Sequence, residues 1–321
     1  MIVSFLKHLL LLFITLFILT LVSYNILLKD PLNEVLATPH FYSGYFFYLQ
    51  NLLNGDLGIS YNAGEAVKNL IFAVLPPTLE LCTMAMFLSL LLGLPLGFIS
   101  STNGHNFLGK TIKSIYVVGL SIPIFWIAPI LLYFSAVNNW EISAIGPYNL
   151  LYEIKPLTGF SIIDVWFIDE PYKIKIIQNV LQHLALPTLV LTILPLMEIA
   201  SFVQQRSDFL FTQNYIKISI THGWSNTKIL YRYILPNTLP LLVPKIPRLF
   251  TIIVAQCMLI EGTFGWPGIG RWIINAVNLQ DYNSISAGVI VIGLCIAIVN
   301  LFTEILIFIL DPFNKKGWYA R

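Results

Sequence analysis

The chain has 321 residues, of which 57% are hydrophobic and 11% are charged, and its formal net charge is +2. Soluble domains carry about 25% charged residues, so this composition excludes an ordinary soluble enzyme and favours a bundle of membrane-spanning helices of about 20 apolar residues each. The small net charge argues against a nucleic-acid partner. The three cysteines have no CxxC or metal-type spacing, so neither a disulfide framework nor a metal site is expected.

Six apolar stretches predict six transmembrane helices in one all-α domain that covers residues 1–321. The first stretch lacks the small-x-small cleavage pattern of a signal peptide, which indicates an uncleaved helix. In the fifth stretch Lys245 and Arg248 leave only residues 249–260 uncharged, but cations near a helix end can snorkel to the membrane interface. The expected spans are residues 9–28, 78–102, 114–139, 184–205, 239–262 and 286–310.

The flanking charges predict that both termini are cytoplasmic. With six spans, one face comprises the N-terminus and residues 103–113, 206–238 and 311–321, and it carries 10 cations and two acids. The opposite face comprises loops 29–77, 138–183 and 263–285, and it carries 6 cations and 10 acids. Cytoplasmic loops are enriched in Lys and Arg, so the first face is expected inside. The external loops are aromatic-rich at 42–48 and 166–172, where short interfacial helices are expected.

The first cytoplasmic loop contains a sequence that imitates a nucleotide-binding motif. Residues 104–111, Gly-His-Asn-Phe-Leu-Gly-Lys-Thr, fit the P-loop pattern GxxxxGK[ST]. That pattern binds phosphate only where a strand enters the loop and a helix leaves it. Here it fills a short turn between two expected spans, so we interpret the match as chance and Lys110 and Lys113 as positive-inside anchors.

The polar stretch 206–238, between the fourth and fifth spans, is too long for a simple turn. Residues 213–221 and 225–233 predict two short helices. Gly223 suits the turn after the first helix, and Pro236 is expected to end the second. A helix–glycine–helix elbow on the cytoplasmic face is typical of an intracellular lid or of a docking knob for another protein.

The elbow resembles the EAA loop of ABC-transporter permeases, in which E-A-A-x3-G is followed by x9-I-x-L-P. The matching sequence is Tyr215-Ile-Lys-Ile-Ser-Ile-Thr-His-Gly, followed after nine residues by Tyr233-Ile-Leu-Pro. Lys-Ile-Ser replaces Glu-Ala-Ala, and Tyr233 replaces Ile. The resemblance implies that the elbow is a coupling helix seated in a groove of a separate ATPase. The residues that it assigns to coupling are Tyr215, Lys217, Ser219, Gly223, Leu235 and Pro236.

Other motifs resemble the dipeptide/oligopeptide branch of these permeases. They are Asn54–Ser60 (GDLG-x-S), Leu75–Leu81, Ser121–Trp126, Thr263–Arg271, Asp281-Tyr282 and Asp311-Pro312. Two further segments, Tyr152–Phe160 and Trp318–Ala320, resemble the peptide-sensitivity (Sap) permeases within that branch.

The resemblance implies a non-catalytic inner-membrane permease of a bacterial, ATP-driven ABC transporter. The implied cargo is peptides, in particular cationic antimicrobial peptides, or polyamines such as putrescine. The chain itself would need no cofactor, because ATP would bind to its partners. The implied partners are a second homologous permease, two ATP-binding subunits, a periplasmic solute-binding protein and membrane lipid.

The two other classes of function are an ion-coupled secondary transporter and an intramembrane enzyme. An ion-coupled secondary transporter would act alone, and such proteins often show inverted halves with broken helices, of which the sequence gives no sign. That class also leaves the long cytoplasmic elbow unexplained. An intramembrane enzyme needs a nucleophile–base or metal pair within the spans, and the sequence shows none.

Acids within or at the ends of spans are candidates for a hydrated cargo pathway, because a carboxylate in a membrane needs water or a partner. Glu198 is the main candidate, followed by Glu80 and Glu261, which also lie close enough to span ends to reach interface water. Glu304 is expected to pair with a neighbouring subunit. The glycines at 265, 268 and 270 are read as a tight external turn that needs positive φ rather than as a substrate gate.

Overall fold

A computed structural model describes residues 2–31, 33, 40–104, 106–142, 145–149, 151–152, 154–168 and 171–310. These residues are helical apart from their connections, and they contain an isolated β-bridge between Ile59 and Ala66 but no strand. Five helical stretches are long and apolar enough to cross a membrane, and a bent pair of helices makes a sixth candidate. The expected all-α membrane class is therefore confirmed. Segment 311–321, with its three expected cytoplasmic cations and two of the motifs, lies outside the described residues.

The helices differ widely in length. The long ones are α1 (Ile2–Leu27), α3 (Val67–Thr102), α7 (Lys173–Phe211), α11 (Ile246–Thr263) and α13 (Tyr282–Leu310). The shorter ones are α2 (Phe41–Leu53), α4 (Phe107–Ser121), α5 (Ile124–Val137), α6 (Ser161–Asp164), α8 (Asn214–Thr221), α9 (Asn226–Ile229), α10 (Leu235–Leu242) and α12 (Ile269–Asn278). Single turns are the 3-10 turns η2 (Val165–Phe167) and η4 (Val243–Lys245) and the π-helical turn η3 (Leu230–Ile234).

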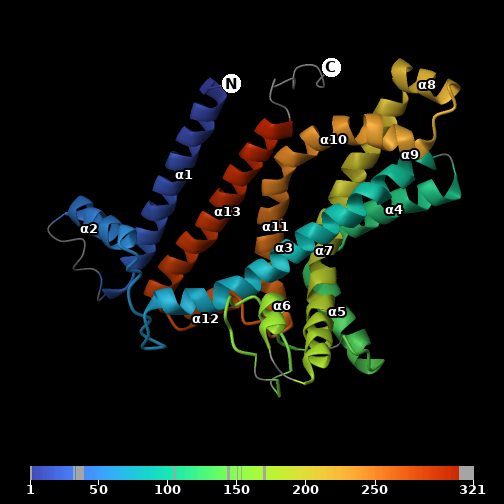
Figure 1. Ribbon diagram of the computed structural model, residues 1–321. Coiled ribbons are helices and arrows are strands. Elements are labelled where there is room, and N and C mark those ends of the chain that lie inside the picture. The colour runs from blue at the N-terminus through green and yellow to red at the C-terminus, as the bar shows by residue number, and fades with distance from the viewer. Residues whose placement is uncertain are drawn as a thin grey trace.

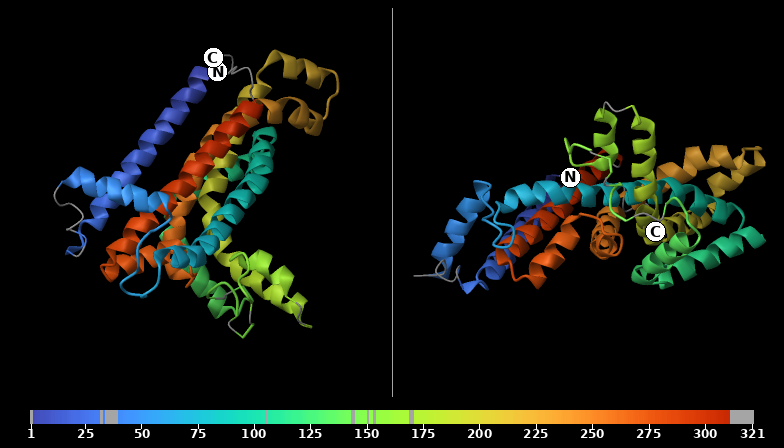
Figure 2. Two further views of the ribbon diagram at one scale, coloured as in Figure 1. Left: turned by 60° about the vertical axis from the view of Figure 1, so that its left-hand side comes forward. Right: turned by 90° about the horizontal axis from the view of Figure 1, so that it is seen from below.

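Helices α3 and α7 cross and form the most extensive contact in the molecule, and α11 packs on both (Figure 1). The main core lies between these three helices and includes the fully buried Leu81, Leu191 and Ile253. Helices α1 and α13 run side by side on one flank (Figure 2). The start of α1, the end of α13 and α8 lie at one end of the bundle, and α5, α6 and α12 lie at the other (Figure 1).

The predicted third span, 114–139, is two helices rather than one. Helices α4 and α5 are bent by 104° relative to each other, at a break between Ser121 and Ile124. Ile122 has extended backbone angles, φ −87° and ψ 122°, because the ring of Pro123 disfavours the α conformation in the residue before it. Pro123 then stands at the N-cap of α5.

Two helices begin well before the spans predicted within them. Helix α3 has 36 residues and α7 has 39, so at about 1.5 Å per residue each exceeds the roughly 30 Å hydrocarbon core of a bilayer. Prolines at 76, 77 and 95 in α3 and at 187 and 195 in α7 do not end these helices. The long helices thus carry their ends, including the entry to the elbow, beyond the apolar layer.

Candidate functional site

The candidate site is the elbow that follows α7. Helix α8 ends at Thr221, and Gly223 has φ +78°, the left-handed conformation in which glycine carries no steric penalty. A Cβ added at Gly223 would meet no atom within 4 Å, so the turn is open to the surroundings. Ser225 begins the next helix, where its hydroxyl oxygen accepts a hydrogen bond from the backbone N–H of Lys228 at 3.3 Å.

The prediction that Pro236 ends the second helix is wrong. Helix α9 passes through the π-helical turn η3 into α10 and then continues to Thr263 as one long helical stretch. Pro236 lies in the first turn of α10, directly after η3, and its missing N–H removes one hydrogen bond to the preceding turn without ending the helix. The wider π turn accommodates the proline ring. The side-chain amide of Asn237 donates to the carbonyl oxygen of Tyr233 at 2.6 Å.

The elbow has a small hydrophobic core of its own. Ile216 of α8, Ile229 of α9 and Ile234 of η3 are fully buried and pack with Phe98 of α3 and Leu210 of α7. On the same side the ring of Tyr233 contacts Tyr215 and Trp224, with centroids 5.3 and 5.7 Å apart respectively. The elbow is therefore fastened to the two helices that form the main core.

Four of the six predicted coupling residues are exposed, namely Tyr215, Lys217, Gly223 and Pro236. Leu235 is half-buried. Ser219 is buried, and its hydroxyl donates to the carbonyl oxygen of Tyr215 at 2.9 Å and contacts the hydroxyl of Tyr233 at 3.3 Å. Ser219 thus holds the elbow together and does not face a partner.

Sequence reasoning missed three large apolar side chains on the outer surface of the elbow. Ile218 is 56% exposed, Ile220 is 47% exposed and Tyr231 is 68% exposed. Their signal in the sequence is the position of apolar residues directly beside Ser219 and Arg232 in an otherwise polar stretch. Apolar side chains that remain exposed outside the membrane spans are typical of a docking surface.

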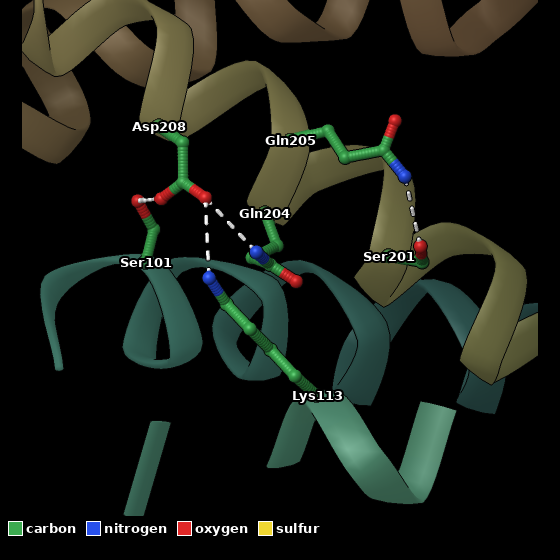
Figure 3. A network of polar contacts seen from close by, with 6 residues as sticks. All are labelled: Ser101, Lys113, Ser201, Gln204, Gln205 and Asp208. Atoms are coloured by element: carbon green, nitrogen blue, oxygen red, sulfur yellow. Dashed lines mark hydrogen bonds and ion pairs between the residues drawn. The ribbon is translucent and has the colours of Figure 1, made fainter. Parts of the chain in front are cut away.

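A polar network joins three helices at the point where α7 enters the elbow (Figure 3). The carboxylate of Asp208 accepts the hydroxyl of Ser101 at 2.5 Å and the side-chain amide of Gln204 at 2.9 Å. The ammonium of Lys113 lies 3.6 Å from the same carboxylate. These contacts tie α3 and α4 to α7. The P-loop-like segment lies here, and it enters helix α4 at Phe107 with no strand preceding its described residues.

Glu80 is buried and anchors an external loop. Its carboxylate accepts the backbone N–H groups of Ser161 at 3.3 Å and Ile162 at 2.6 Å, which are the first two residues of α6. Asp164 closes the same loop by accepting the backbone N–H of Thr158 at 2.8 Å and that of Gly159 at 3.0 Å. In this structure Glu80 therefore accepts hydrogen bonds from the backbone of the loop and does not face a water-filled space.

Glu261 is fully buried and fastens the turn between α11 and α12. Its carboxylate accepts the hydroxyl of Thr78 at 2.5 Å and the backbone N–H of Arg271 at 2.9 Å. Only Gly265 of the three turn glycines has positive φ, at +61°. Gly268 and Gly270 instead permit close approach, since an added Cβ would lie 2.1 Å from the carboxyl of Glu261 and 2.6 Å from the backbone of Met258 respectively. The positive φ expected of this turn is therefore found at Gly265, and the other two glycines serve close packing.

Glu198 is the most accessible of the three predicted pathway acids. Its side chain is 20% exposed and pairs with the guanidinium of Arg248 at 3.1 Å, which joins α7 to α11. Arg248 is itself 69% exposed. Close by, the ammonium of Lys245 lies 4.0 Å from the ring centre of Phe202. The structure thus places Glu198 apart from Glu80 and Glu261, in a mixed-charge patch between two spanning helices.

Comparison with known proteins places these features in a family context. The family described as binding-protein-dependent transport system inner membrane component matches residues 93–316. The chain is 58% identical over 318 residues, 99% of each chain, to the peptide transport system permease protein SapB of Haemophilus influenzae. It is 36% identical over 320 residues to the putrescine export system permease protein SapB of Escherichia coli K12, covering 100% of this chain and 99% of that protein. It is 30% identical over 271 residues to the di/tripeptide transport system permease protein DppB of Pseudomonas aeruginosa, covering 84% and 80%. The resemblance to this branch and its Sap permeases is confirmed.

Proposed function

The chain belongs to the family of binding-protein-dependent transport system inner membrane components, and from this membership we propose that it is a permease subunit of an ATP-driven peptide transporter. As a member of this family it is an inner-membrane transport component and not an enzyme. Its proposed partners are a second homologous permease, two ATP-binding subunits and a periplasmic solute-binding protein. ATP would bind to the partner subunits, so the chain itself would hold no cofactor.

The observation that carries the ATP-driven mechanism is the elbow. It exposes Lys217, Gly223 and three large apolar side chains, and it is fastened through Ile216 and Asp208 to the helices that build the core. A force applied to such an elbow reaches α3, α4 and α7 together. We propose that closure of the ATP-binding subunits moves the elbow and thereby switches the cargo path from one face of the membrane to the other. If the chain were an ion-coupled transporter acting alone, the exposed surface of the elbow would have no partner.

The proposed cargo is a small cation, either a cationic peptide or a polyamine. One relative is named for peptide transport and another for putrescine export. The external loops of this chain carry 10 acids against 6 cations, which favours the approach of positively charged solutes at low salt. Among the three predicted pathway acids, we propose Glu198 as the one that cargo encounters, because the other two are engaged in holding loops.

Transport by reconstituted vesicles tests the proposal. Vesicles containing both permeases and the ATP-binding subunits receive a labelled cationic peptide, putrescine or a neutral dipeptide. We expect ATP-dependent movement of at least one of the two cations, faster than that of the neutral dipeptide. Movement of cargo by the chain alone under an ion gradient would support a secondary transporter instead. ATP-dependent movement of the neutral dipeptide only would contradict the cargo proposal.

A further inference from the structure

The elbow carries an excess of positive charge. Residues 206–238 contain four cations and one acid. Lys217, Lys228 and Arg232 are all exposed, and no described carboxylate lies within ion-pair distance of them. The ammonium of Lys228 lies 4.0 Å from the ring centre of Trp224, which holds this charge beside the Gly223 turn. The exposed Ile218, Ile220 and Tyr231 lie among these cations along the chain.

The single acid of the elbow is not available to balance these charges. Asp208 is occupied by Ser101, Gln204 and Lys113 at distances of 2.5, 2.9 and 3.6 Å. All three partners lie outside residues 206–238, on α3, α4 and α7 (Figure 3). The outer surface of the elbow therefore combines three large exposed apolar side chains with cations that no described carboxylate balances.

A cleft of mixed polar and apolar lining lies beside Lys217. It has a volume of about 500 Å³, and its wall includes Thr102, Lys113, Asp208, Lys217 and Asn226. Lys113 is already paired with Asp208, whereas Lys217 is not paired within the described chain. Because Asp208 is already held by Lys113 and Ser101, the ammonium of Lys217 remains to receive a carboxylate that enters from outside.

Lys217 also occupies the position at which the EAA pattern has glutamate. The charge at this point of the elbow is therefore reversed with respect to that pattern. A partner groove that suits glutamate would repel Lys217, and specificity of this kind depends on opposed charges as much as on attractive ones.

We propose that the elbow docks into an acidic-rimmed apolar groove of the ATP-binding subunit, in which a carboxylate of that subunit pairs with Lys217. This inference rests on the proposed function and names the chemistry of the partner. A second copy of the chain is disfavoured as the occupant because two cationic elbows repel each other. An anionic lipid surface would also suit exposed apolar and cationic side chains, so lipid binding is an outcome of the nanodisc test below.

Charge reversal tests the proposal in the intact complex. The permease is co-expressed with the second permease and the ATP-binding subunits, purified in mild detergent, and assayed for retained ATP-binding subunit at increasing NaCl. We expect Lys217→Glu to lower retention by about tenfold or more at low salt, because a carboxylate then faces a carboxylate. Lys217→Gln should give an intermediate loss, and wild-type retention should fall with salt. Lys110→Glu, at an exposed lysine of α4 that does not line the cleft, is the matched control and should retain the subunit as wild type does.

A compensating change identifies the partner group. In the Lys217→Glu background, single acids lining the candidate groove of the ATP-binding subunit are changed to Lys, and one such change should restore retention. Wild-type retention by Lys217→Glu, or retention insensitive to salt, would overturn the inference while leaving the proposed function intact. Recovery of no ATP-binding subunit with the wild-type chain would remove both.

A membrane control separates protein from lipid as the partner. The same variants are placed in nanodiscs of phosphatidylcholine alone or with added phosphatidylglycerol. We expect the loss of ATP-binding subunit in both lipids. A loss confined to the anionic nanodiscs would assign Lys217 to the lipid surface and overturn the inference.

Discussion

The hydroxyl of Thr78 donates to the carboxylate of Glu261 across 2.5 Å, joining α3 to α11 between residues that are 183 positions apart in the chain. The same threonine oxygen accepts the backbone N–H of Ile269, the first residue of α12, at 2.8 Å. Beside it, the indole N–H of Trp266 donates to the carbonyl oxygen of Pro77 at 3.2 Å. One buried cluster thus sets the position of the turn between α11 and α12.

The first prediction concerns this threonine. Thr78→Val should lower the free energy of unfolding by about 1–3 kcal/mol, because it removes the donor to a buried carboxylate and the acceptor of a buried N–H. Thr83→Val is the matched control, since Thr83 is exposed and its hydroxyl bonds only to backbone oxygens of its own helix. The measurement is the thermal unfolding midpoint of the purified protein in detergent. Equal midpoints for the two variants would contradict the role of the cluster.

The second prediction concerns Gly268. Gly268→Ala should destabilise the protein by about 1–3 kcal/mol or more, because its Cβ would lie 2.1 Å from the carboxyl carbon of Glu261, which is fully buried. Gly262→Ala lies in the same region, on α11, where an added Cβ meets nothing within 4 Å. That control should be neutral or stabilising by up to about 1 kcal/mol, since alanine favours helix. The measurement is the thermal unfolding midpoint of both variants. An unchanged midpoint for Gly268→Ala would refute the close-approach explanation.

Glu80 and Glu261 show why part of the candidate site was not predictable from the sequence. Local sequence signals were enough to predict the turn of the elbow, because Gly223 and Ser225 act on their immediate neighbours. The partners of Glu80 lie 81 and 82 positions away, and no pattern in one sequence indicates such pairs. Charge and position alone therefore made Glu80 and Glu261 resemble pathway residues.

Two helices differ from their sequence predictions for opposite reasons. The run from 114 to 139 predicts one span because hydropathy does not register the effect of Pro123 on the residue before it, although Ile-Pro is a local signal. At Pro236 the opposite error arose, since the proline rule predicts a helix end and the π-helical turn η3 accommodates the ring. Packing of α8 against Tyr233 likewise decides that Ser219 faces inward.

The third prediction concerns Gly223. Gly223→Arg should abolish the coupling of ATP hydrolysis to transport while the protein still reaches the membrane, because it places a large side chain at an open turn that we propose to be docked. The positive φ adds backbone strain of about 1–2 kcal/mol. Gly64→Arg is the matched control, because Gly64 has φ +69° and equally open surroundings but lies in an expected external loop.

Paired assays separate coupling from folding in these two variants. Both should reach the membrane at similar levels, and Gly64→Arg should retain ATP-dependent transport in reconstituted vesicles. Normal transport by Gly223→Arg would contradict the coupling role of the elbow. Equal loss of transport in both variants would attribute the defect to backbone strain alone.

The fourth prediction concerns orientation in the membrane. Fusions of a topology reporter after residues 110, 160, 222, 275 and 321 should report inside, outside, inside, outside and inside. The reason is the excess of cations in the expected cytoplasmic segments, 10 against two acids. The measurement compares alkaline phosphatase fusions, which are active outside, with green fluorescent protein fusions, which fluoresce inside. An external signal at 222 would place the elbow beyond the reach of a cytoplasmic ATPase.

The last prediction concerns the ion pair between Glu198 and Arg248, whose charged atoms are 3.1 Å apart. Glu198→Gln leaves the 69% exposed guanidinium without its carboxylate, so the local charge becomes more positive. A cationic cargo that passes this patch would then meet stronger repulsion. We expect its transport rate to fall about fivefold, which corresponds to about 1 kcal/mol, with a smaller effect on a neutral dipeptide.

Substitution of the other partner, Arg248, should change cation transport in the opposite direction and serves as the control. Arg248→Gln leaves the carboxylate of Glu198 unpaired, so transport of the cation should be retained or should rise relative to the neutral dipeptide. The double variant removes both charges and should return the ratio of the two rates toward that of the wild type, since the two effects are coupled. Rates of labelled putrescine, cationic peptide and neutral dipeptide are measured in vesicles holding the complete complex. Because loss of the ion pair alone would slow all cargoes equally in both single variants, only opposite shifts in the ratio of cationic to neutral transport support contact of cargo with Glu198.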